Sequence, residues 1–283
     1  MIDKIYNSDC IEFMRGLTDV KINCIMTSPP YNTGRPYNDE YYRQMYDARY
    51  DVYIDEKTPE EYIQWTDMLF NLFNGILKEN GVIIYNISYS SDSSVNNVNC
   101  DTVWRVISHI IEETPFTVAD RIIWKKSCAL PNNMSKNKLT RICEDVFVFC
   151  RKSEYLTFNC NKEVSSIRDT GQLMYKNYFN YIEARNNDGA CDLNKATYST
   201  DLVVPLLKLY CKPGDTIYDP FMGTGTTAVA AKSLGMHYIG TEISEAQCKY
   251  AENRILNMDN TVIKTIDEST GQETTKILHK RGF

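Results

Sequence analysis

The chain has 283 residues, with 31 basic against 37 acidic side chains and a formal net charge of −6. This length predicts one large α/β domain or two modest ones, and it allows folding without help from a metal or a disulfide. No apolar run reaches the roughly 18–20 residues of a membrane span, and the N-terminus lacks the basic and apolar regions of a signal peptide. We therefore expect a cytoplasmic protein with no membrane partner.

The ten cysteines are scattered and form no Cys-x-x-Cys pair, and the three histidines lie far apart in the sequence. Metal sites and disulfide frameworks need closely and regularly spaced ligands. The pattern therefore predicts reduced, mostly buried thiols and no metal site.

Seven apolar runs have the length and composition of β-strands. Several of them are continuously apolar rather than alternating, which is typical of strands that helices cover on both faces. In chain order the runs cover residues 2–6, 23–27, 82–86, 121–124, 146–150, 216–218 and 237–241.

Helical patterns lie between these runs. Thr58-Pro59-Glu60-Glu61 predicts a helix start, since Thr followed three residues later by Glu is a capping box and Pro suits the first turn. A second capping box, Ser244-Glu245-Ala246-Gln247, predicts a helix to about Leu256, and a helix from Thr226 is expected to end at Gly235. Alternating strands and helices predict a doubly wound, largely parallel sheet.

Three stretches depart from this rhythm. Residues 32–57 are polar and rich in Tyr. Residues 153–195 mix Tyr, Asn, Lys and Gly, and we interpret this second stretch as an inserted recognition region. Residues 261–279 are expected to form a hairpin around Ser269-Thr270-Gly271. The chain is therefore divided into a main domain, residues 1–152 and 196–283, and an insertion, residues 153–195.

A proline-rich loop, Ser28-Pro29-Pro30-Tyr31, follows the second strand-like run. The two prolines stiffen the loop and remove two backbone donors. The Ser28 hydroxyl and the Pro29 carbonyl can accept the hydrogens of an –NH2 group, and Tyr31 offers a flat face on which a base can stack. These features suit an exocyclic amine whose lone pair must be aimed at an electrophile. A turn that only ends a strand is the alternative.

A glycine-rich turn, Asp219-Pro220-Phe221-Met222-Gly223-Thr224-Gly225-Thr226, joins a strand to a helix start. Glu242 ends the next strand, where an acid can accept hydrogen bonds from both hydroxyls of a ribose. The turn lacks the third glycine of the NAD fingerprint and the Gly-Lys pair of a P-loop. It predicts a nucleoside site without a pyrophosphate, with a ligand-free tight turn as the alternative.

Together the two motifs resemble those of the S-adenosylmethionine-dependent amino-DNA methyltransferases, which modify the exocyclic amine of cytosine or adenine. Residues 28–31 match the family's (Asp/Asn/Ser)-Pro-Pro-(Tyr/Phe) motif, and residues 219–227 match its cofactor motif. The catalytic motif comes first, which is the permuted order of the beta group. The resemblance implies a mixed, Rossmann-like methyltransferase sheet of about seven strands, with target recognition in the insertion.

The resemblance also implies direct methyl transfer without a covalent enzyme intermediate, and S-adenosylmethionine as the cofactor. The catalytic residues that it implies are Ser28, Pro29, Pro30 and Tyr31. Asp9 would accept a hydrogen bond from the adenine amino group of the cofactor, and Asp219 would hold its methionine end. The full set of implied cofactor-binding residues is Asp9, Asp219, Pro220, Phe221, Gly223, Gly225, Thr226 and Glu242.

The positive charge is confined to one part of the chain. Residues 121–185 hold 12 basic and 6 acidic side chains (+6), whereas residues 1–120 hold 9 and 19 (−10) and residues 186–283 hold 10 and 12 (−2). This excess predicts the surface that meets duplex DNA. The candidate phosphate contacts are Lys125, Lys126, Lys136, Lys138, Arg141 and Arg168.

Several alternatives stay open. In the family that the motifs resemble, Ser at the first motif position goes mostly with cytosine N4 and Asp with adenine N6, so Ser28 favours cytosine, with adenine as the alternative. A catalytically inert DNA-binding subunit is a further alternative. The Tyr-rich residues 32–57 are expected either to form a lid over the base or to pack as an ordinary helix. A homodimer and a cognate restriction endonuclease remain open as partners.

Overall fold

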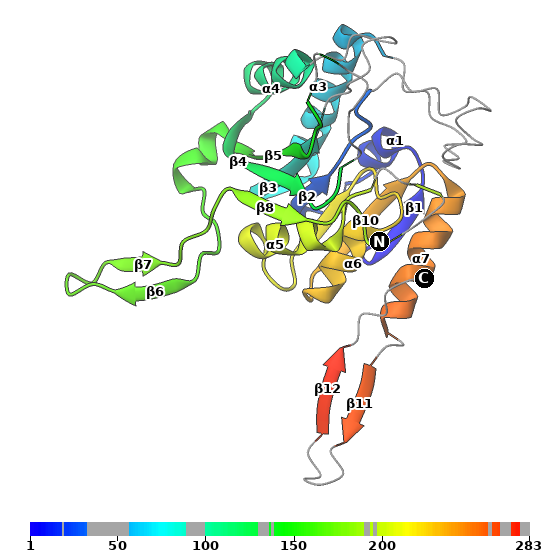
Figure 1. Ribbon diagram of the computed structural model, residues 1–283. Helices are drawn as coiled ribbons and strands as arrows, with labels where there is room; N and C mark the ends of the chain where they lie inside the picture. The colour runs from blue at the N-terminus through cyan, green and yellow to red at the C-terminus, as the bar shows by residue number, and fades with distance from the viewer. Residues whose placement is uncertain are drawn as a thin grey trace.

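The computed structural model describes residues 1–18, 20–32, 57–88, 100–129, 136, 139–189, 193–194, 197–259, 262–266 and 273–277. Its central feature is a single mixed sheet of eight strands (Figure 1). The strands are β1 (Lys4–Asn7), β2 (Ile22–Thr27), β3 (Leu77–Ile87), β4 (Phe116–Lys126), β5 (Cys143–Arg151), β8 (Tyr181–Ala184), β9 (Thr216–Asp219) and β10 (His237–Glu242). Their order across the sheet is β1-β10-β9-β2-β3-β5-β4-β8.

The structure confirms the seven predicted strands and adds an eighth. Strand β5 runs antiparallel to both β3 and β4, whereas the other neighbouring strands are parallel. The additional strand, β8, lies within the stretch interpreted as an insertion and pairs in parallel with β4. The last part of that stretch therefore extends the main sheet.

Helices cover both faces of the sheet (Figure 1). Side chains along β2 alternate between the two sides, because Ile25 packs in one apolar cluster and Cys24 and Met26 pack in the other. The first cluster contains side chains of α1 (Cys10–Arg15), α3 (Pro59–Ile76) and α4 (Cys100–Glu113). The second contains side chains of α5 (Thr200–Tyr210), α6 (Thr226–Ser233) and α7 (Glu245–Asp259).

The predicted helix boundaries follow from local hydrogen bonds. Thr58 and Glu61 form the complete capping box at the start of α3. At α7 the Ser244 hydroxyl accepts a hydrogen bond from the Gln247 backbone N–H at 3.4 Å, but the Gln247 side chain bonds elsewhere. Helix α6 stops two residues before Gly235, whose φ of 68° lies in the left-handed region that favours glycine.

Two hairpins extend from this body (Figure 1). Strands β6 (Val164–Ile167) and β7 (Leu173–Tyr175) form an arm that follows the short 3₁₀ helix η1 (Lys152–Thr157). Strands β11 (Val262–Ile266) and β12 (Glu273–Ile277) form the second hairpin, as the sequence predicted for residues 261–279. In the described part of the chain, no helix is both long and apolar enough to span a membrane.

The two predicted motifs meet in the middle of the sheet. Strands β2 and β9 are neighbours and parallel, so the loops that follow them leave the same edge side by side. From β2 the chain continues to β3 on one side, and from β9 it continues through α6 to β10 on the other. Such a reversal of strand order opens a crevice at the carboxyl ends of the strands, where α/β proteins bind ligands.

Candidate active site

One buried hydrogen bond joins the proline-rich loop to the glycine-rich turn. Thr27, the last residue of β2, donates from Oγ1 to Oδ1 of Asp219, the last residue of β9, at 3.0 Å. Thr27 and Asp219 are both buried. The bond fixes the start of the loop that carries Ser28 relative to the start of the turn that carries Gly223.

The proline-rich loop is held from the side of α3. The hydroxyl of Tyr62 donates to the Pro30 carbonyl at 2.8 Å. Just beyond the motif, the side chain of buried Asn32 donates to the Lys57 carbonyl at 2.6 Å and accepts from the Lys57 N–H at 2.9 Å. Residues 33–56 lie outside the described residues, and they make up nearly all of the Tyr-rich stretch 32–57 for which the sequence predicted either a lid or ordinary helix packing.

Three polar side chains converge on the hydroxyl of Tyr31, and a fourth, Lys126, pairs with one of them. Ser28 Oγ lies 2.8 Å from the Tyr31 hydroxyl, which donates to Glu144 Oε2 at 3.0 Å. Asn86, at the end of β3, donates from its amide nitrogen to the Tyr31 hydroxyl and to Glu144 Oε2, the latter at 2.9 Å. Lys126 forms an ion pair with Glu144 Oε1. Burial and the negative charge of Glu144 together raise the pKa of Tyr31 well above its usual value.

The carboxylate of Asp219 supports the glycine-rich turn through hydrogen bonds. Besides Thr27, its carboxylate accepts from the Phe221 backbone N–H at 3.0 Å, the Tyr198 hydroxyl at 2.9 Å and Thr227 Oγ1 at 2.6 Å. Burial raises its pKa, although these donors act in the opposite direction. Both carboxylate oxygens are therefore bonded within the protein, and contact with the methionine end of a cofactor stays a prediction.

The turn itself requires glycine at two positions. Gly223 and Gly225 have φ values of 53° and 86°, where L side chains are strained. A Cβ at Gly225 would also lie 2.7 Å from the Cβ of Ala251 in α7. Glu242 closes the turn, because Oε2 accepts from the Gly223 N–H and Oε1 from the Ser244 N–H, both at 2.9 Å. Burial raises the pKa of Glu242.

A buried amide beside the turn offers an unused donor. Gln247 is fully buried on α7, and its Oε1 accepts from Asn194 Nδ2 at 3.0 Å. Its Nε2 has no hydrogen-bond partner among the residues that the structure describes. A Cβ built at Gly223 would lie 3.5 Å from the side chains of both residues, so the amide pair borders the glycine turn. A ligand with an acceptor oxygen would satisfy Nε2 there.

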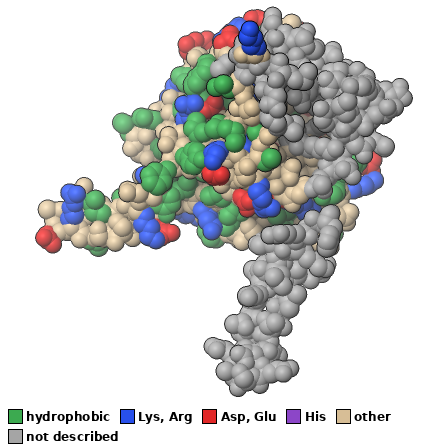
Figure 2. All heavy atoms as spheres, viewed as in Figure 1, with side chains coloured by type: hydrophobic (Ala, Val, Ile, Leu, Met, Phe, Trp, Pro, Cys, Tyr) green, Lys and Arg blue, Asp and Glu red, His purple; other side chains and the backbone are tan. Residues whose placement is uncertain are grey.

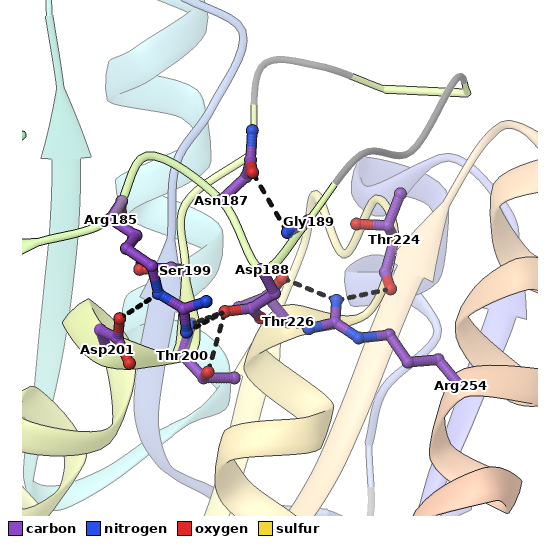
Figure 3. Close-up of polar contacts among 10 residues, drawn as sticks. All are labelled: Arg185, Asn187, Asp188, Gly189, Ser199, Thr200, Asp201, Thr224, Thr226 and Arg254. Carbon is purple, nitrogen blue, oxygen red and sulfur yellow. Dashed lines mark hydrogen bonds and ion pairs between the residues drawn. The ribbon is translucent and has the colours of Figure 1, made fainter. Parts of the chain in front are cut away.

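The outer side of the turn is held by Arg254 of α7 (Figure 3). Its guanidinium donates to the Thr224 carbonyl at 3.3 Å and to Thr226 Oγ1 at 3.0 Å, and it forms an ion pair with Asp188. Asp188 also accepts from the backbone N–H and the hydroxyl of Thr200, at 2.8 and 2.9 Å. The loop after β8 is thereby tied both to α5 and to the turn.

Three other predicted cofactor residues have structural contacts of their own. Asp9 caps α1, since its Oδ1 accepts from the Ile11 and Glu12 N–H groups at 2.8 and 3.1 Å. Phe221 packs against Trp65 of α3, with ring centroids 5.7 Å apart. The Pro220 carbonyl accepts from Thr241 Oγ1 at 2.9 Å, which braces the turn against β10.

The predicted phosphate contacts are not all free side chains. Lys125 forms an ion pair with Glu183 at 3.0 Å, and Lys126 forms an ion pair with Glu144. Lys136 and Arg168 are exposed, and Arg141 is half-buried; Lys138 lies outside the described residues. Arg168 lies on the β6–β7 arm, along which Figure 2 shows basic, acidic and hydrophobic side chains.

The sequence pattern did not single out the side chains that support the two motifs. These residues are Asn86, Glu144, Tyr198, Arg254 and Gln247. Two signals in the sequence pointed toward them. Asn86 ends the predicted strand 82–86, and Tyr198 precedes the helix that leads into β9.

Comparison with known proteins now decides the family. The family model described as DNA methylase, N6_N4_Mtase, matches residues 22–253, which include both motifs. The chain belongs to this family. It is 24% identical over 291 residues to the Type II methyltransferase M.Cfr9I of Citrobacter freundii, covering 92% of this chain and 90% of that protein. It is also 24% identical over 260 residues to M.BglII of Bacillus subtilis, covering 86% of this chain but 66% of the relative.

Solved structures of similar proteins have the same fold. The PvuII DNA methyltransferase, described as cytosine-N4-specific, superposes with a TM-score of 0.65 at 18% identity, over 90% of each chain. The complex of M1.HpyAVI with SAM superposes with a TM-score of 0.58 at 18% identity, over 89% of this chain and 98% of the other. The mixed Rossmann-like sheet predicted from the motifs is thereby confirmed.

Proposed function

We propose that this protein transfers a methyl group from S-adenosylmethionine to the exocyclic N4 of a cytosine flipped out of duplex DNA. One observation carries the proposal. The Thr27–Asp219 hydrogen bond holds the start of the loop that carries Ser28 and Tyr31 beside the start of the glycine-rich turn, at the carboxyl ends of β2 and β9. A base acceptor and a nucleoside cradle therefore share one site.

The residues of the turn fit this cofactor. The two glycines leave the backbone open to close approach, Glu242 offers a buried carboxylate for ribose hydroxyls, and Gln247 Nε2 offers an unused donor. When bound, the cofactor would supply a methyl group on a sulfonium sulfur. The sulfur would keep the electron pair of the broken S–C bond. The protein supplies position and hydrogen bonds, and no nucleophilic side chain is needed.

The proline-rich loop would receive the target base. Ser28 Oγ and the Pro29 carbonyl would each accept a hydrogen of the amine, which directs the nitrogen lone pair away from the loop and toward the turn. The ring of Tyr31 would stack on the base and return part of the few kcal/mol lost when the base leaves the DNA helix.

Ser28 supports cytosine as the target. The resemblance associates Ser at this position mostly with cytosine N4, and the PvuII enzyme that shares the fold is described as cytosine-N4-specific. Adenine N6 is the alternative within the same family. The two products are chemically distinct, so one experiment separates them.

The β6–β7 arm is our candidate for reading the DNA sequence. All of residues 161–173 are exposed, and Arg168 and Lys176 lie on the arm. With β8 in the main sheet, the arm is the part of residues 153–195 that projects from the body (Figure 1). The remaining contacts would go to phosphates, from the basic residues 121–185.

The test is incubation with radiolabelled S-adenosylmethionine and unmethylated duplex DNA, followed by digestion to nucleosides. We expect label in 4-methylcytosine. Label in 6-methyladenine would overturn the choice of base, and unlabelled DNA would overturn the methyltransferase proposal for this chain.

Two substitutions test the assigned roles. Ser28→Ala and Tyr31→Ala are each expected to slow methylation by about 100-fold, because they remove an amine acceptor and the stacking face. Neither residue lies in the glycine-rich turn, so the cofactor dissociation constant measured by calorimetry should stay unchanged. Loss of cofactor binding in either variant would contradict this division of roles.

A further inference from the structure

The hydrogen-bond directions around Tyr31 are determined by its neighbours. A tyrosine hydroxyl has one hydrogen, and here it is donated to Glu144 Oε2, whose carboxylate can only accept. The 2.8 Å contact between Ser28 Oγ and the Tyr31 hydroxyl must therefore be a donation from Ser28. One lone pair of Ser28 Oγ faces Asn86 Nδ2 at 3.5 Å, and the other remains available to a substrate, whereas its single hydrogen does not.

Glu144 is placed to keep this direction. Its side chain is 9% exposed, and three donors surround its carboxylate: Lys126, Asn86 and Tyr31. These donors bond to the carboxylate in a setting that is largely closed to water. The carboxylate of Glu144 orients the hydroxyl of Tyr31, and Tyr31 then orients the hydroxyl of Ser28.

We propose that Glu144 receives, through Tyr31 and Ser28, the proton that the target amine loses during methyl transfer. The inference rests on the proposed function, in which Ser28 faces the amine. When the amine nitrogen uses its lone pair to form the N–C bond, it becomes positively charged and must lose one proton. That proton passes to Ser28 Oγ, the Ser28 proton passes to the Tyr31 oxygen, and the Tyr31 proton passes to Glu144 Oε2. The products are a neutral methylated amine and a protonated Glu144.

The same arrangement selects the substrate group. Because Ser28 is fixed as an acceptor, it matches an N–H donor and repels an exocyclic carbonyl oxygen at the same position. An amine-bearing base is therefore accepted, and a base that carries oxygen there, such as thymine, is disfavoured. Glu144 touches no substrate atom and acts only through Tyr31.

The side chains that bond to Glu144 come from three parts of the fold. Among the described residues that contact the Glu144 side chain, the titratable ones are Tyr31 from the loop after β2 and Lys126 from β4. Asn86 from β3 is polar but does not titrate. Asp145, the next residue along β5, is engaged with Arg121 at 2.7 Å.

The test compares Glu144→Gln, Tyr31→Phe and the double variant by single-turnover methylation, which reports the chemical step rather than product release. Each single variant should lose about 10- to 1000-fold in rate. The double variant should lose no more than either one, because both substitutions break the same series of hydrogen bonds. We expect the rate of the natural protein to fall toward low pH and the rate of Glu144→Gln to show no such fall. Asp145→Asn, which breaks a neighbouring ion pair, serves as the matched control and should keep the natural rate and pH profile.

Two further measurements separate this role from a structural one. Cofactor binding by calorimetry and the thermal unfolding midpoint should be unchanged in Tyr31→Phe, which keeps the ring and removes only the hydroxyl. Additive losses in the double variant, or a pH profile that survives in Glu144→Gln, would overturn the proton transfer to Glu144. If the natural protein itself transfers no methyl group to DNA, the proposed function fails instead.

Discussion

At the scale of one residue, Glu242 should make cofactor affinity depend on pH. The side chain is buried, and burial raises the pKa of its carboxyl above the usual 4.5. Ribose hydroxyls need the ionised carboxylate as acceptor, so cofactor affinity should fall as pH drops through this raised pKa. Calorimetric titrations between about pH 5 and pH 8 measure the effect. Glu242→Gln should bind more weakly and should lack this pH dependence.

The fold should not fail over the same pH range because of Glu242. A carboxyl whose pKa is raised in the folded state holds its proton more tightly than in the unfolded chain. Its contribution to the free energy of unfolding therefore grows as pH falls from the raised pKa to the unfolded value. If Glu242→Gln kept the pH dependence of binding, another group would be responsible for it.

The β6–β7 arm makes a separate prediction at the scale of one element. Two-stranded hairpins are marginal in water on their own, and Ile167 and Leu173 of this one are exposed. Replacing residues 164–175 with a short Gly-Ser linker should therefore weaken specific DNA binding by at least about 10-fold, since a partner surface is removed. Cofactor binding and thermal stability should persist, because the arm contributes nothing to the two apolar clusters.

Gel-shift titrations with specific and unrelated duplexes check this expectation. Lys208→Ala, which removes an exposed charge from α5, is the matched control and should leave DNA binding unchanged. Equal affinity of the shortened chain and the natural chain for the specific duplex would show that recognition lies elsewhere.

The elements also show how far sequence patterns reach. The seven apolar strands and the Thr58 capping box follow from local sequence, so they could be predicted. Strand β8 could not, because its four residues are only partly buried and its one sheet partner is β4. The Tyr31–Glu144 contact joins residues 113 positions apart, and the Gln247–Asn194 pair forms only when α7 meets the loop between β8 and α5.

At the scale of the whole molecule, the net charge of −6 conceals a local excess of basic residues. Two of the six predicted phosphate contacts, Lys125 and Lys126, are already paired with carboxylates. We therefore expect a modest salt dependence, with a slope of log affinity against log salt of about −4 or shallower between about 50 and 200 mM. Fluorescence anisotropy at several salt concentrations measures it, and a slope near −10 would contradict this charge distribution.

The pairing of β2 with β9 affects how the chain is made. The two strands are neighbours in the sheet, yet the Thr27–Asp219 bond joins residues 192 positions apart. At about 5–20 residues per second of synthesis, β2 waits roughly 10–40 seconds on the ribosome before β9 exists. During that time the strand that leads into the proline-rich loop has an open edge on the side that β9 later covers. A nascent chain halted before residue 219 would contain Ser28 and Tyr31 without the turn beside them. The open edge of β2 is then a surface that a chaperone can bind.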